Sequence, residues 1–163
     1  MCVLNKKTLK PYLIALVLIV AILVVCSIPL HLPKPGNEPI HIFLGMNEGG
    51  ADHIEAEYLI ESETEEFNNV CHILEQLSYH ISPRAGIDLT SPKAMDSPFE
   101  YAFLIYSTNH GSYTYLSVSK RGILSKDNQA YAIGCFGDDI AARWLAELGH
   151  VLKSVEPENI EKF

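Results

Sequence analysis

The chain has 163 residues, of which 48% are hydrophobic and 20% are charged, and its formal net charge is −8. Residues 36–163 hold all 20 acidic side chains and only eight of the 12 basic ones, so this part carries a net charge of −12. The negative phosphates of a nucleic acid repel a domain with this net negative charge, which excludes a nucleic-acid-binding function. The same part is long enough for one domain with a core and too short for two.

The N-terminus carries a basic tip followed by an apolar run. Lys6, Lys7 and Lys10 precede residues 12–30, which contain no charged side chain. As a helix this run of 19 residues rises about 28 Å, close to the hydrocarbon thickness of a bilayer. Because the lysines lie before the run, the positive-inside rule predicts a single-pass cell-membrane protein with a cytoplasmic N-terminus and its C-terminal domain outside.

Two segments are therefore expected. Residues 1–35 form the cytoplasmic tip, the transmembrane signal-anchor and the start of a proline-rich linker, and residues 36–163 form an extracytoplasmic domain. Two alternatives for the apolar run stay open. One is a signal peptide cleaved near Ser27, and the other is lipid attachment at Cys26.

The first half of the domain predicts two strands, a helix and a loop. Hydrophobic patterning places strands at residues 40–44 and 54–60, separated by a glycine-containing loop. Ser62 and Glu65 form a capping box that predicts the start of a helix, whose apolar stripe runs to Leu77. Residues 82–98 contain three prolines and predict a long irregular loop, with room for a short strand at residues 86–89.

The second half predicts an antiparallel meander closed by a helix. Turn sequences divide it into four strands, at residues 101–106, 112–118, 123–124 and 129–136. A helix begins near Asp138, and its apolar stripe runs from Ile140 to Leu152. The expected fold class is α+β: an N-terminal transmembrane helix followed by a mostly antiparallel sheet with two helices packed on one face.

Aromatic residues at odd positions of neighbouring strands form the candidate binding surface. If both helices cover the other face of the sheet, this surface is open to a cell-envelope protein or to a glycan. The alternative is that the rings pair across strands only to stabilise the sheet. The candidates are Tyr101, Phe103, Tyr113, Tyr115 and Tyr131.

Two cysteines fall in the predicted extracytoplasmic domain. Cys71 lies on the apolar stripe of the first helix and Cys135 near the end of a strand. Outside the cytoplasm the pair is a candidate disulfide. The alternative is that each thiol is a small buried hydrophobe.

No catalytic, cofactor or metal motif is recognisable. The sequence lacks a phosphate-binding glycine loop, a Gly-x-Ser-x-Gly elbow, a His-Glu-x-x-His pair and a Cys-x-x-Cys pair. We therefore expect a non-catalytic protein without metal or cofactor. Two alternatives stay open: a hydrolase-like or metal-dependent enzyme, released by signal-peptide cleavage and using residues 82–98 with nearby histidines such as His72 and His110, and a structural subunit of a membrane complex.

The overall layout resembles a group of small membrane-anchored extracytoplasmic proteins of Gram-positive bacteria, classed as domains of unknown function. The likeness lies in the anchor, the Glu-rich helix start at residues 61–67, the tyrosine-rich hairpin at residues 101–118, and Tyr131-Ala132-Ile133 before the closing helix. The resemblance implies a membrane-bound setting and no catalytic residue. The function expected is a membrane-anchored binding or accessory domain.

Overall fold

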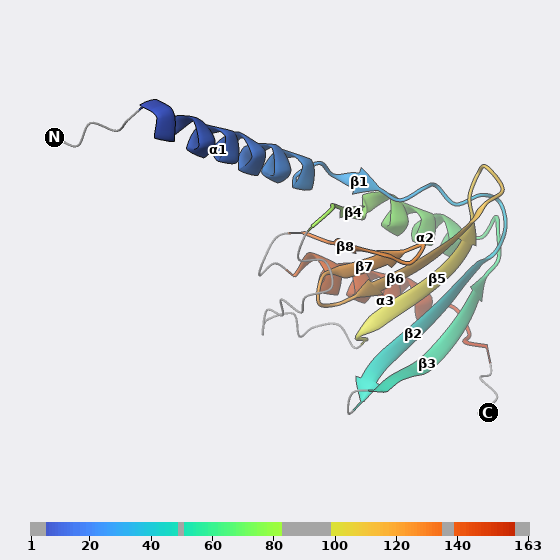
Figure 1. The fold of residues 1–163 in the computed structure, drawn as a ribbon. Helices are drawn as coiled ribbons and strands as arrows, with labels where there is room; N and C mark the ends of the chain where they lie inside the picture. The colour runs from blue at the N-terminus through green and yellow to red at the C-terminus, as the bar shows by residue number, and fades with distance from the viewer. Residues whose placement is uncertain (1–5, 49–50, 83–98, 135–138, 159–163) are drawn as a thin grey trace.

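The centre of the protein is a six-stranded antiparallel sheet with the strand order β3-β2-β5-β6-β7-β8. The computed structural model describes residues 6–48, 51–82, 99–134 and 139–158. Two helices, α2 and α3, lie on one face of the sheet (Figure 1), so the predicted α+β fold is confirmed. The strands are β2 (Ile40–Glu48), β3 (Ala51–Ile60), β5 (Tyr101–Ser107), β6 (Tyr113–Ser119), β7 (Ile123–Lys126) and β8 (Gln129–Ala132).

Side chains alternate between the two faces of the sheet along each strand, and one of these two sets packs against the helices. In β5 the even-numbered residues Ala102, Leu104 and Tyr106 are buried, whereas the odd-numbered residues up to Ile105 are only half-buried. Their cross-strand partners in β2 and β6, such as Ile42 and Leu116, are fully buried as well. The core therefore lies between this face and the two helices.

Helix α2 (Glu65–Gln76) begins slightly later than the capping box predicts. Its N-cap is Thr64, whose hydroxyl accepts a hydrogen bond from the Phe67 backbone N–H at 3.1 Å. The predicted Ser62 cap is wrong, because Glu63 adopts a left-handed backbone (φ 67°) and turns the chain just before the helix. Of the predicted apolar stripe, Phe67, Val70, Leu74 and Leu77 are buried and Cys71 is half-buried, and Ile73, which was not predicted, is buried as well.

Helix α3 (Ile140–Leu152) packs beside α2 and over β6. The indole Nε1–H of Trp144 donates to the backbone carbonyl of Ile73 at 3.0 Å, which ties the two helices together. Gly149 lies inside α3 and does not end it, and a side chain there would press on the ring of Phe99.

The β2–β3 hairpin is longer than predicted. Most of the loop expected at residues 45–52 is strand, with a bulge between Leu44 and Gly45, and residues 49–50 lie outside the described residues. The strand predicted at residues 129–136 ends at Ala132 in the structure. The loop expected at residues 82–98 and its short strand fall almost wholly outside the described residues.

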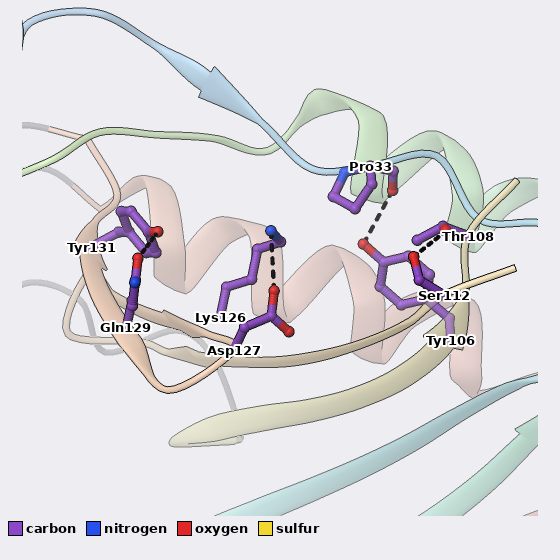
Figure 2. A network of polar contacts seen from close by, with 8 residues as sticks. All are labelled: Pro33, Tyr106, Thr108, Ser112, Lys126, Asp127, Gln129 and Tyr131. Atoms are coloured by element: carbon purple, nitrogen blue, oxygen red, sulfur yellow. Dashed lines mark hydrogen bonds and ion pairs between the residues drawn. The ribbon is translucent and has the colours of Figure 1, made fainter. Parts of the chain in front are cut away.

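A two-stranded sheet, which the sequence did not predict, joins β1 (Leu30–His31) to β4 (Ser78–Tyr79). The chain then continues along the domain as a strap, defined here as residues 30–38. The expected linker is thus bound to the domain: the Gly36 N–H donates to the carbonyl of Ser107 at 2.7 Å, and the Tyr106 hydroxyl donates to the carbonyl of Pro33 at 3.1 Å (Figure 2). Lys34 pairs with Glu75 of α2 at 2.8 Å, which lowers the pKa of that carboxyl.

Helix α1 (Lys6–Cys26) precedes the strap and runs away from the sheet (Figure 1). Its large apolar side chains from Tyr12 to Val25 are between 50 and 72% exposed. The structure describes the side chains of α1 from Pro11 onwards. Among the described residues, no helix has both the length and the hydropathy needed to cross a bilayer.

The buried phenol of Tyr106 predicts a loss of stability at alkaline pH. Burial raises the pKa of Tyr106, so above about pH 10 the unfolded chain releases this proton while the folded protein keeps it. The free energy of unfolding should therefore fall as the pH rises from about 10 towards the higher pKa of the folded state. Tyr106→Phe should make this fall shallower and should cost about 1 kcal/mol at neutral pH, because the carbonyl of Pro33 loses its donor.

Urea unfolding of the full chain in detergent, at neutral and alkaline pH, measures both effects. Tyr115→Phe changes an exposed ring and is the matched control. An equally steep alkaline fall in wild type and Tyr106→Phe would contradict the assignment of this proton to Tyr106.

Candidate functional site

The face of the sheet that the helices leave uncovered carries the candidate site. We call it the open face, and it comprises the side chains of β2, β5 and β6 that point away from the core. Cross-strand pairing arranges them in rows: Gly45 beside Tyr101 and Ser119, Phe43 beside Phe103 and Ser117, and His41 beside Ile105 and Tyr115. Tyr113 lies at the end of β6 beyond the third row.

A hollow of about 450 Å³ opens over the first two rows. Its lining combines three aromatic rings and one aliphatic side chain with four polar side chains. Most ligand pockets combine an apolar lining with a few polar groups in this way. The lining residues are Phe43, Ile54, Glu100, Tyr101, Phe103, Ser117, Ser119 and Arg121.

Two contacts set the aromatic part of the hollow. The rings of Phe43 and Phe103 are 5.9 Å apart between centroids and tilted by 42°. Tyr101 lies across Gly45, where a Cβ atom would overlap the phenol ring. Glycine on β2 therefore lets Tyr101 lie against the sheet, the arrangement in which an aromatic ring covers a strand glycine.

The polar part comes from the ends of β5 and β6. Glu100 forms an ion pair with Lys120, and the Lys120 N–H donates to the carbonyl of Glu100 at 2.8 Å. The Ser119 hydroxyl accepts from the Arg121 N–H at 3.3 Å. Hydroxyl, carboxylate and guanidinium groups thus line the hollow together with the aromatic rings.

Tyr113 and Tyr115 lie outside the hollow but on the same face. They are 60% and 52% exposed. The Tyr113 hydroxyl donates to Oε2 of Glu38 at 3.0 Å, and this hydrogen bond raises the pKa of the phenol. The bond also links the open face to the last residue of the strap.

Tyr131 does not belong to this surface, which corrects its predicted place. It pairs with the fully buried Leu124 and packs edge-on against Tyr79, with ring centroids 4.9 Å apart. Its hydroxyl donates to Gln129 at 2.7 Å (Figure 2). Asp127 and Asn128 form a two-residue turn, which reverses the odd–even pattern, so the odd positions of β8 face the core side.

The sequence did not predict the remaining members of the site. Phe43 of β2 and Ser117 and Ser119 of β6 lie at odd positions and follow the same alternation as the predicted aromatic residues. Glu100, Gly45 and Arg121 carry no such signal, because they lie beside a bulge or at strand ends. Their neighbourhood depends on register, which a single sequence does not give.

The proposed disulfide remains a prediction. Cys71 lies half-buried on α2, and burial raises the pKa of its thiol. Cys135 lies outside the described residues, so the distance between the two sulfurs is not defined.

The two histidines named for the enzyme alternative lie on α2 and in the turn between β5 and β6. Nε2 of His72 lies 2.8 Å from the side-chain amide of Gln76 on the same helix. The hydroxyl of Ser112, next in the chain to the His110–Gly111 turn, bonds to Thr108 at 2.9 Å (Figure 2). Within the described ranges no group of three or more His, Cys, Asp or Glu side chains is placed to hold a metal ion.

Comparison of the chain with known protein families, with curated proteins and with solved structures gave no match. The site must therefore be interpreted from its own chemistry. It can hold a molecule by ring contact and by hydrogen bonds to hydroxyl, carboxylate and guanidinium groups.

Proposed function

We propose that this protein is a membrane-anchored binding or accessory domain whose open face takes a ligand outside the cytoplasm, without catalysis. The observation that carries the proposal is the uneven cover of the sheet. Both helices pack on one face, while the other exposes tyrosines and a hollow of about 450 Å³. Aromatic rings exposed beside polar groups are typical of binding surfaces.

Three features support the anchor. Residues 12–30 contain no charged side chain and follow three lysines, which favours a cytoplasmic N-terminus. The exposed apolar side chains of α1 need an apolar environment, and each one moved from water into lipid is stabilised by about 1.5–3 kcal/mol. The strap begins four residues after Cys26, so the domain lies within about 14 Å of the helix end.

Protease treatment of intact cells tests the anchor and its orientation. The full chain with a C-terminal tag should sediment with membranes, and external protease should remove the tag. A tag that sediments but resists external protease, and is cleaved only after lysis, would contradict the orientation. A tag found free in the medium would support cleavage near Ser27 and a diffusible protein.

Crosslinking in cells tests the binding face. A photoreactive side chain in place of Tyr115 should give a discrete adduct, which Tyr113→Ser in the same chain should weaken. The matched control places the photoreactive group at Lys153, exposed at the end of α3 in the helix layer. Equal adducts at both positions, or none at Tyr115, would contradict binding by the open face.

A further inference from the structure

The backbone of the strands under the hollow restricts which ligands can bind there. β5 is hydrogen-bonded to β2 on one side and to β6 on the other. Its N–H and C=O groups, and those of its neighbours on these sides, already have partners. A peptide that binds by β-augmentation adds its own backbone to a free strand edge, and β2, β5 and β6 offer none because each has a neighbour on both sides.

The polar groups exclude a wholly apolar ligand. An acyl chain over Phe103 would also cover the charged groups of Glu100 and Arg121 and the hydroxyls of Ser117 and Ser119. Polar groups taken out of water without new hydrogen bonds each cost about 1–3 kcal/mol. The ligand must therefore bring its own hydroxyl or amide groups to these polar side chains.

Charge disfavours an anion. The lining holds one carboxylate, Glu100, and one guanidinium, Arg121, so it has no net charge of its own. Residues 36–163 as a whole carry a net charge of −12. An anionic ligand would approach against the field of the whole domain. A neutral ligand meets no such barrier.

A pyranose ring meets all three conditions. Its C–H groups form an apolar face that stacks on an aromatic ring, and its hydroxyls around the edge both donate and accept hydrogen bonds. Phe103 and Tyr101 provide the aromatic rings, the Glu100 carboxylate accepts, the Arg121 guanidinium donates, and the Ser117 hydroxyl does both.

From these features we infer that the hollow is a binding site for a neutral sugar ring of a glycan. The inference rests on the proposed function and names the ligand class of its open face. Phe103 and Tyr101 stack on the sugar, and the side chains of Glu100 and Ser117 bond to its hydroxyls. Gly45 is a positioning residue, because it leaves room for the ring of Tyr101.

Ligand-observed NMR with the full chain in lipid nanodiscs tests this site. The probes are cellohexaose, maltohexaose and chitohexaose, with empty nanodiscs as the blank. At least one probe should receive saturation from the protein. Ser117→Phe, which fills the hollow from a strand position that accepts aromatic residues, should weaken binding by about tenfold or more. Phe103→Leu should weaken it as well, whereas Lys153→Ala, exposed at the end of α3 and absent from the lining of the hollow, should leave it unchanged.

Two results would overturn the inference. One is the absence of saturation transfer to all three sugars from a protein whose circular dichroism shows it to be folded. The other is binding that survives both Ser117→Phe and Phe103→Leu. Should Ser117→Phe fail to fold, Phe103→Leu decides alone, and sugar binding that it leaves unchanged overturns the inference. A discrete protein adduct at Tyr115 together with no sugar binding would leave the proposed function standing and reject only the glycan.

Discussion

Replacing Trp144 by alanine should lower the free energy of unfolding by about 3–5 kcal/mol, the range for truncation of large buried aromatic residues. The side chain is 5% exposed and lies where α3 meets α2. Alanine removes the packing volume and also the indole N–H that donates to the carbonyl of Ile73. Urea unfolding of the full chain in detergent measures the change.

Trp144→Phe separates the two contributions, since it keeps most of the packing and removes only the donor. Its cost should be about 1–2 kcal/mol, the price of leaving the Ile73 carbonyl unpaired. A loss below about 1 kcal/mol for Trp144→Ala would show that the helix layer contributes little to the core. In that case the helices would not explain why only one face of the sheet is open.

The meander was predictable because its turns have local chemistry. Gly111 and Gly122 adopt φ of 75° and 80°, and Asp127 and Asn128 adopt φ of 50° and 63°. These are the residue types that tolerate a left-handed backbone, so the sequence places each reversal without knowledge of the fold. The strands between the turns then follow from alternation.

The face on which Tyr131 lies could not be predicted from the turn residues. Its face depends on whether the last turn contains two residues or three, and a difference of one residue moves every following side chain to the other side. The pairing of Lys126 with Gln129 decides the matter, and only the structure gives it. Four of the five residues predicted for the candidate surface therefore lie on the open face. The fifth, Tyr131, was assigned to the wrong face because the sequence does not give the register.

The strap was missed for a different reason. Pro33 and Gly36 are typical of a solvated linker. The contacts that attach this segment are the burial of Leu32 in the core, the ion pair of Lys34 with Glu75, and the hydrogen bonds of the Gly36 N–H and the Pro33 carbonyl. One leucine and two backbone groups make no periodic pattern of hydrophobic side chains, so the sequence did not predict this attachment.

Leu104 and its neighbour Phe103 allow a direct test of the open face, since adjacent residues of β5 point to opposite sides of the sheet. Leu104 is fully buried, and Leu104→Ala should cost about 2–5 kcal/mol. Phe103→Ala removes a larger side chain, yet it should cost only about 1 kcal/mol, because the ring is half-buried and no helix covers it. The two free energies of unfolding come from the same urea titration.

The comparison also bears on function. Phe103 is expected to contribute little to stability, although its aromatic ring lines the hollow. An exposed aromatic ring of this kind is typical of a ligand-binding surface. The Phe103→Ala protein should then stay folded and lose sugar binding. Leu104→Ala should instead act mainly by lowering the free energy of unfolding. Equal costs for the two substitutions would mean that the open face is covered in the folded protein, and the proposed binding surface would have to be abandoned.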